Sequence, residues 1–295
     1  MASQPRTEPR RLPVRPGPMH NETVFSYVGR LADANHLSWA RMRAFLAKPS
    51  DADPRAPIVP DRIAAATGYS LLGLAQALPE LRWQTVDRWR FHPRPLPACP
   101  GCYQGLPVVR FLDSDILICC RHQRWIGPPD NRPGRQHIDL SALPDVIAAQ
   151  ARHRNLRRRH GYITMGLAWG DALRIHLRWA QRGEHGQHSR RRLDALAHDP
   201  RHKIQLGDDA FHASIYPETV ALASLLASAH WQHTAQAYAK ERMMTFFAEA
   251  ARRIGSPNYT PYYASDPLGL WVDTIRTGGA RQRAARAALH GDTKR

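Results

Sequence analysis

Four metal-binding side chains gathered in a short stretch constrain this chain more than any other feature of its sequence. Cys99 and Cys102 are separated by two residues, and after sixteen further residues Cys119 and His122 are again separated by two. Two such pairs, each carried by a tight turn, can bring three thiolates and one imidazole into the tetrahedral arrangement that suits zinc. The spacing therefore predicts one zinc ion held by Cys99, Cys102, Cys119 and His122.

This predicted zinc site has the composition of a structural site. Four protein ligands fill the coordination shell, whereas a catalytic zinc keeps one position open for water or substrate. The runs VVRF (residues 108–111) and ILIC (116–119) between the two pairs are typical of short strands. We expect these strands to pair with each other in a zinc ribbon at residues 97–126. Cys120 is an alternative to Cys119, although the spacing of the first pair favours Cys119.

The number of cysteines also indicates a cellular location. Four cysteines in 295 residues are too few for a disulfide scaffold. Thiols remain available to a metal in a reducing compartment, so we expect a cytoplasmic protein. No apolar run approaches the roughly 18 residues needed to span a bilayer, and the Pro-rich N-terminus lacks the apolar stretch of an export signal. We therefore expect no membrane association.

A large excess of positive charge points to the class of partner. The chain has 42 Lys and Arg residues against 25 Asp and Glu residues, which gives a formal net charge of +17. GC-rich coding explains why most of the basic residues are arginine, but it does not explain the shortage of acidic residues. This balance predicts a polyanionic partner. Of the two candidate classes, DNA ranks ahead of an anionic membrane surface, and we expect DNA.

Arginines concentrate in two clusters, at residues 152–160 and 188–192. Such side chains can contact phosphates, which positions a protein on DNA without reading its sequence. A solvated helix face is the alternative explanation for either cluster. The candidate DNA contacts are Arg154, Arg157, Arg158, Arg159, Arg190, Arg191 and Arg192.

Residues 61–81 have the pattern of a helix-turn-helix-like pair. Gly68 can take the positive φ that ends the first helix, and Ser70 can cap the second. In a DNA-reading pair the second helix enters the major groove. Gln76 is a candidate base contact, but the second helix contains no Arg or Lys, so protein docking is the alternative use. The positions expected to be exposed are Tyr69, Leu72, Gln76 and Glu80.

Helical periodicity dominates the remainder of the chain, so the predicted fold class is mostly α. A helix is expected from about Glu22, with Asn21 as its cap, and the longest helix is expected over residues 217–254 with one or two breaks. The predicted plan is a disordered Pro/Arg-rich lead (1–20), an N-terminal domain (21–140), an all-helical C-terminal domain (141–275) and a basic tail (276–295).

No catalytic constellation stands out in the sequence. It contains no phosphate-binding P-loop and neither the G-x-S-x-G nor the H-E-x-x-H motif, so we expect no enzyme. Most histidines lie in polar, Arg-rich stretches and are expected at the surface. Four tryptophans are expected in the core and not as base-stacking platforms: Trp169, Trp179, Trp231 and Trp271.

Three motifs in order resemble the TniQ/TnsD family of transposition target-selection proteins, over about residues 12–140. The first is a proline-rich lead followed by Glu22, Ser26, Tyr27, Arg30, Leu31, Ala32 and Asn35, with Asn21 and Thr23 where the family usually has Gly and Ser. The second is the helical pair. The third is the order of the two metal-binding pairs, which ends in Cys119, His122 and Trp125. Some members carry a further cysteine pair, whereas here the following linker offers only His137.

This resemblance implies a non-enzymatic adaptor that selects the target site for DNA transposition. Such a protein binds DNA, or docks on an RNA-guided complex, and recruits an AAA+ ATPase of the TnsC/TniB type, which in turn engages the transposase. The resemblance also implies that a homodimer can form. A stand-alone zinc-containing DNA-binding regulator is the alternative from the same residues. The sequence does not reveal the DNA target.

Overall fold

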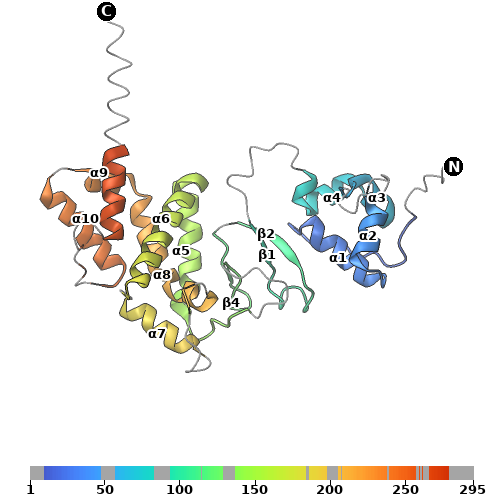
Figure 1. Cartoon of the computed structure of the whole chain (residues 1–295), viewed down its shortest axis with the longest axis horizontal. Coiled ribbons are helices and arrows are strands. Elements are labelled where there is room, and N and C mark those ends of the chain that lie inside the picture. Colours follow the sequence, from blue (N-terminus) through green and yellow to red (C-terminus); the bar gives the residue numbers. More distant parts are fainter. Residues whose placement is uncertain are drawn as a thin grey trace, which may run out of the picture. The chain divides into compact units, whose positions relative to one another are not determined.

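The computed structural model describes residues 10–47, 57–82, 94–113, 115–128, 137–183, 186–197, 205–206, 208–237, 239–256, 259, 261 and 266–278. The chain divides into two compact units, of which the first takes in residues up to 114 and 131–137. The second takes in residues 115–130 and those from 138 onward. Helices make up most of the described chain, which confirms the mostly α fold class (Figure 1). None of the described helices is long and apolar enough to cross a membrane.

Short helices form most of the first unit. Its core contains Tyr27, Leu31, Met42, Ile63 and Leu74, all with no measurable exposure. The helices are α1 (Val24–Ala34), α2 (Trp39–Leu46), α3 (Pro60–Thr67) and α4 (Leu71–Ala77), followed by a 3-10 turn, η1 (Pro79–Leu81).

Helix α1 begins later than the sequence predicted. Thr23, and not Asn21, is its N-cap, because the Thr23 hydroxyl accepts the N–H of Ser26. Asn21 lies just before the cap with φ of 60°, a left-handed conformation that cannot begin a helix. The residue predicted as a cap therefore shapes the turn that leads into α1.

The predicted helical pair at residues 61–81 is present as α3 and α4. Gly68 ends α3 with φ of 77°, and its N–H donates to the carbonyl of Ala64. Ser70 caps α4 by accepting the N–H of Gly73. Both capping predictions are confirmed.

Two small antiparallel sheets lie in the region of the predicted ribbon. In the first unit β1 (Arg94–Pro97) pairs with β2 (Val109–Leu112), and in the second unit β3 (Ile118–Cys119) pairs with β4 (Arg124–Trp125). The two predicted runs are thus strands, but the prediction that they pair with each other is wrong. The amides of Leu117 and Ile118 donate to the side chain of Gln150, which satisfies these donors without a neighbouring strand.

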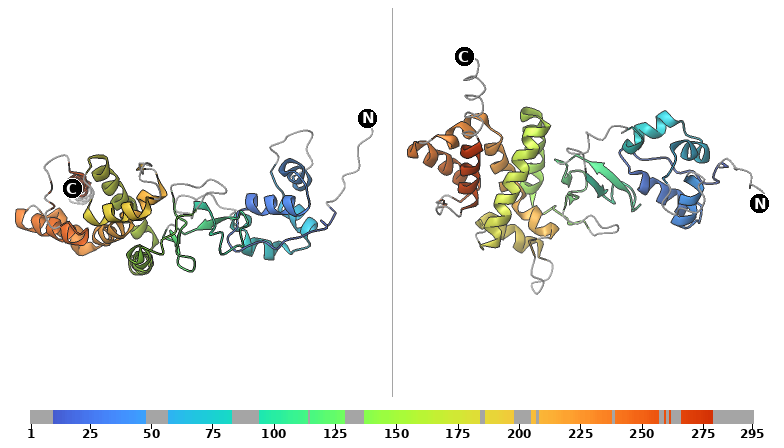
Figure 2. Two further views of the ribbon diagram at one scale, coloured as in Figure 1. Left: turned by 90° about the horizontal axis from the view of Figure 1, so that it is seen from below. Right: turned by 45° about the horizontal axis from the view of Figure 1, so that its top comes forward.

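Longer helices build the second unit around α8 (Asp209–Leu226) (Figure 2). Most of α8 is buried, because it packs against α5, α6, α7 and α10. A further helix, residues 267–278, adds Leu268 and Val272 to the core. The other helices are α5 (Pro144–His160), α6 (Tyr162–Gln181), α7 (Gln187–Leu196), α9 (Ala229–Gln236) and α10 (Lys240–Arg253).

The long helix predicted at 217–254 is three helices, α8 to α10, so the prediction of breaks is confirmed but its start is wrong. Helix α8 begins at Asp209 and carries Pro217 in its interior. A proline there costs roughly 3 kcal/mol, and the burial of both faces of α8 offsets that cost. The four tryptophans are core residues as predicted: Trp179 is buried, and the other three pack partly buried against the same core.

Candidate metal centre and interaction surfaces

The two predicted metal-binding pairs come together. The ligand atoms of Cys99, Cys102, Cys119 and His122 all lie within 4.8 Å of one another, which makes a possible metal-binding site. This is the one such cluster of His, Cys and acidic residues among the described parts of the chain. Cys99 is buried, Cys102 is exposed, and the other two are half-buried.

Tight turns deliver the ligands on each side. Cys99 follows β1 closely, and the N–H of Cys102 donates to the Cys99 carbonyl at 3.0 Å, which closes the first turn. Cys119 is the last residue of β3, and the β3–β4 turn carries His122. Gln123 completes this turn with φ of 50°. Each pair is therefore fixed by local backbone geometry.

The separations fit a small tetrahedral ion. In a zinc tetrahedron with Zn–S of about 2.3 Å and Zn–N of about 2.05 Å, the S···N edge is about 3.6 Å. The Sγ of Cys119 lies 3.6 Å from Nδ1 of His122. Nδ1 is thus the imidazole nitrogen turned toward the cluster. Three sulfurs and one nitrogen are the donor set that zinc accepts in closed, structural sites.

Cys120 lies apart from this cluster. Its side chain is exposed, and its Sγ faces the carbonyl of Ile118 at 3.9 Å. Successive residues at the end of a strand point to opposite sides, which explains why only one of Cys119 and Cys120 can join the site.

A buried ion pair explains part of the N-terminal motif. The Glu22 carboxylate accepts Nε of Arg30 at 2.9 Å, Nη2 of Arg30 at 2.6 Å and the N–H of Met19. The Ser26 hydroxyl donates to the same carboxylate and accepts the N–H of Val109. These motif residues connect α1 to β2 and to the N-terminal lead, which is a structural role that spacing alone did not reveal.

Two other motif residues hold the N-terminal lead in place. The Asn35 amide donates to the carbonyl of Val14 and its oxygen accepts the Val14 N–H. The Tyr27 hydroxyl donates to the carbonyl of Pro16. Leu12 is buried in the core. The disordered lead predicted for residues 1–20 is therefore replaced by an anchored, extended segment from Leu12 onward, while residues 1–9 lie outside the described part.

The exposed surface of α4 is mainly apolar. Leu72 and Leu71 are 70% and 44% exposed, and Gln76 is also exposed. Glu80 is not an exposed position as predicted, because its carboxylate accepts the N–H of Val24 at the start of α1. Burial raises the pKa of Glu80. Apolar side chains suit a protein partner better than the edges of bases.

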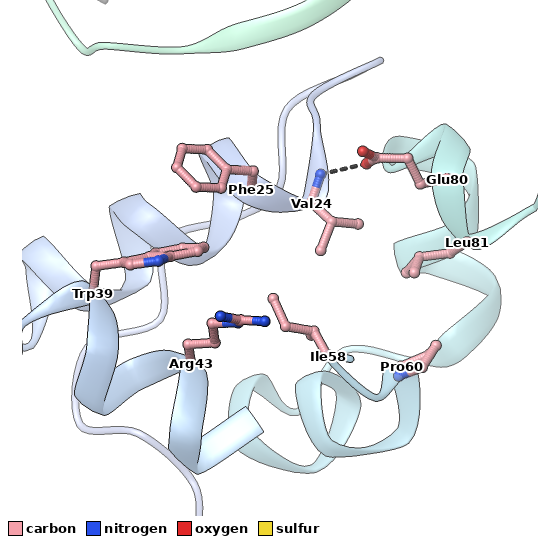
Figure 3. Close-up of a pocket in the computed structure, with 8 residues that line it drawn as sticks. All are labelled: Val24, Phe25, Trp39, Arg43, Ile58, Pro60, Glu80 and Leu81. Atoms are coloured by element: carbon pink, nitrogen blue, oxygen red, sulfur yellow. Dashed lines mark hydrogen bonds between the residues drawn. The ribbon is translucent and has the colours of Figure 1, made fainter. Parts of the chain in front are cut away.

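A groove of about 630 Å³ lies on the first unit (Figure 3). Phe25 and Trp39 form one side of it, with ring centroids 4.4 Å apart, and Phe25 is 63% exposed. Its other lining residues are Val24, Arg43, Ile58, Pro60, Glu80 and Leu81. An exposed aromatic pair of this kind is typical of protein-binding surfaces.

The candidate arginines fall into two groups. Arg154, Arg158 and Arg159 on α5, and Arg190 and Arg191 on α7, are exposed. By contrast, Arg157 forms an ion pair with Asp115.

Arg192 is buried. Its Nη1 donates to both carboxylate oxygens of Glu218 and to the carbonyl of Ser214, and its Nε donates to Asp145. These bonds connect α5, α7 and α8, so Arg192 contributes to the packing of the second unit and has no surface to offer a phosphate.

Several histidines are not the surface residues that were predicted. His153 lies within hydrogen-bonding distance of the Tyr216 hydroxyl, 3.1 Å away, and burial lowers its pKa to about 4. Burial also lowers the pKa of His176 to about 4. Helix periodicity identifies His153, which follows Val146 and Ala149 on the buried face of α5.

Comparison with known families agrees with the N-terminal geometry. A family model described as TniQ matches residues 13–125, a span that includes the Glu22–Arg30 pair, the helical pair and all four metal-site residues. No curated protein and no solved structure matches the chain. At the level of the family, the match associates residues 13–125 with transposition. Residues 13–125 of this chain are therefore a TniQ domain.

Proposed function

We propose that the protein is a target-site selection adaptor for DNA transposition. It binds DNA, or an RNA-guided complex already bound to DNA, and recruits an AAA+ ATPase of the TnsC/TniB type, which engages the transposase. The TniQ domain at residues 13–125 is the observation that carries this proposal. The net charge of +17 supports the DNA-binding part.

The metal in this proposal is one structural zinc ion. The 3.6 Å separation of Cys119 Sγ and His122 Nδ1 and the Cys3His donor set support zinc over a hard cation such as Mg²⁺, which prefers oxygen ligands. Four protein ligands leave no position for a substrate, so the ion stabilises the fold and takes part in no reaction. Binding of such an ion is coupled directly to folding.

We propose the aromatic groove as the surface that receives the ATPase. Phe25 and Trp39 offer a large rigid contact area, and exposed aromatics of this kind dominate binding energy at protein interfaces. The apolar face of α4, with Leu71 and Leu72, is the second candidate surface. Gln76 remains a candidate base contact only if α4 enters a DNA groove.

The organisation proposed for the whole chain keeps a TniQ-like domain at 21–140, a helical C-terminal domain at 141–275 and a basic tail at 276–295. Of the tail, residues 279–295 lie outside the part that the structure describes. A homodimer and a cytoplasmic location complete the proposal.

Co-purification tests the proposal. The protein is mixed with an AAA+ ATPase encoded beside its own gene, and we expect the two to elute together in the presence of ATP and DNA. A stand-alone zinc-containing DNA-binding regulator is the alternative, since a closed zinc site and a basic chain serve either role. No association with the ATPase, combined with sequence-specific binding to its own promoter, would establish the regulator instead.

A further inference from the structure

A basic cleft opens on the second unit. Its volume is about 470 Å³, and three helices line it. The lining residues are Arg152, Asn155, Leu156 and Arg159 of α5, Val220, Ala221 and Ser224 of α8, and Arg252 and Arg253 of α10. The arginine cluster at residues 152–160 indicated only the α5 part of this set, because Arg252 and Arg253 lie far from that cluster in the sequence.

The α5 side of the cleft carries two cations in a row. Arg152 and Arg159 are seven residues apart, which places them on the same face of the helix with about 10.5 Å of axial rise between them. Both side chains are exposed, and neither forms a hydrogen bond or ion pair within the described chain. Asn155 and Leu156 lie between them.

The α10 side holds its arginines in fixed positions. Glu249 accepts Nε and Nη2 of Arg252 at 2.7 and 2.8 Å, and it accepts Nε of Arg253 at 2.6 Å. Nη1 of Arg253 also donates to the Ser224 hydroxyl. The hydrogen bond from Arg252 is the main reason why the pKa of Glu249 is lowered to about 2.

The charge of the cleft is strongly unbalanced. Four guanidinium groups with one neighbouring carboxylate, Glu249, leave a net charge of +3. The cleft floor is apolar where Leu156, Val220 and Ala221 line it, and such walls strengthen the attraction of an anion. Guanidinium groups match phosphate oxygens in bidentate geometry.

We propose that this cleft binds backbone phosphates of nucleic acid. The two α5 arginines lie along one line, as needed for a ligand with repeated charges, and the cleft is open and not a closed pocket for a single small anion. The inference rests on the proposed function in one respect, since it assumes that the adaptor contacts DNA. It then assigns that contact to α5, α8 and α10 and not to the helical pair, where α4 has no basic residue.

Salt-dependent binding tests the cleft. Anisotropy of a fluorescent 30-bp duplex is measured across a series of KCl concentrations for the full-length protein and for Arg152→Gln/Arg159→Gln. Loss of two phosphate contacts should reduce the slope of log K against log salt by about 1.8. The control is Arg178→Gln/Arg242→Gln, which removes two charges from exposed positions on α6 and α10 outside the cleft. Circular dichroism checks that both variants are folded.

The outcomes separate the cleft from the proposed function. A reduced slope in the cleft variant, with a near-normal slope in the control, supports the cleft. Equal slopes for the two variants overturn it while DNA binding by the adaptor stands. Displacement of the duplex by inorganic phosphate or ATP at matched ionic strength would overturn it in favour of a single-anion site. If the unaltered protein binds no duplex yet retains the ATPase, the DNA-binding part of the proposed function fails, and the cleft fails with it.

Discussion

The carboxylate of Glu22 and the guanidinium of Arg30 form a two-point ion pair in the interior of the first unit, with 0% and 6% side-chain exposure. Such a pair offsets its desolvation only when geometry and additional hydrogen bonds are good, and here Ser26 and the N–H of Met19 also bind the carboxylate. The residues that carry the TniQ motif thus hold the N-terminal lead, α1 and β2 together.

Replacing Glu22 should therefore destabilise the first unit. Glu22→Ala leaves the Arg30 guanidinium buried without its anion, and we expect a loss of about 3–5 kcal/mol in the free energy of unfolding. Urea denaturation followed by circular dichroism measures it. Glu241→Ala, at an exposed position in the first turn of α10, is the control and should change stability by less than about 0.5 kcal/mol. Similar midpoints for the two variants would show that the buried pair is not required.

Removal of a metal ligand should unfold the region around it. Cys102→Ser takes one thiolate from the site, and we expect loss of stoichiometric zinc, measured by inductively coupled plasma mass spectrometry, with a lower melting temperature. Cys120→Ser is the matched control, because its thiol lies outside the cluster. Full zinc content in Cys102→Ser, or zinc loss in Cys120→Ser, would contradict the assignment.

Neighbouring arginines on α7 should behave in opposite ways. Arg192→Gln breaks the contacts with Asp145 and Glu218, so we expect a loss of about 3–5 kcal/mol. Arg191→Gln removes an exposed side chain and should cost less than about 0.5 kcal/mol. Denaturation midpoints for the two variants compare these effects directly, and equal losses would argue against a structural role for Arg192.

Buried histidines should make stability depend on pH. His153 and His176 have folded-state pKa values of about 4, below the ordinary value of 6.5, so the unfolded chain binds more protons than the folded chain between these limits. Their contribution is therefore intact above pH 6.5 and is lost as the pH falls toward 4. Each histidine contributes a slope of about 1.4 kcal/mol per pH unit in that window.

Denaturation at pH 7.0 and pH 5.0 measures this slope. His176→Gln cannot titrate, so it should lose less stability than the unaltered protein between the two values. His188, which is exposed, provides the control variant His188→Gln, which should retain the full pH dependence. A slope that is the same in all three proteins would show that His176 is protonated in the folded state.

The aromatic groove offers a test of ATPase docking. Phe25 is 63% exposed, so Phe25→Ser should leave stability nearly unchanged. Loss of an aromatic hot spot should reduce ATPase binding by tenfold or more, which corresponds to about 1.4 kcal/mol or more. Leu72→Ser alters the apolar face of α4 and serves as the comparison. Stronger loss in Leu72→Ser would assign docking to α4 instead.

Sequence alone determined the features that depend on spacing and on local backbone chemistry. In each of the two metal-binding pairs, Cys99/Cys102 and Cys119/His122, the spacing of two intervening residues predicts a tight turn. Gly68 and Ser70 predict their helix ends, because a left-handed glycine and a capping hydroxyl act within a few residues of themselves. The family motif also depends only on the order and spacing of residues along the chain, so the sequence was enough to identify the TniQ domain.

Tertiary structure decided everything that depends on which distant side chain is nearby. Arg191 and Arg192 are indistinguishable as letters, yet one faces solvent and the other is bound by Glu218 from α8. Strand pairing also depended on distant partners, since β2 pairs with β1 while Gln150 of α5 binds the amides of Leu117 and Ile118. Burial and hydrogen bonding depend on residues that are distant in the sequence and become neighbours only in the folded protein. Two chemically identical side chains can therefore have different roles.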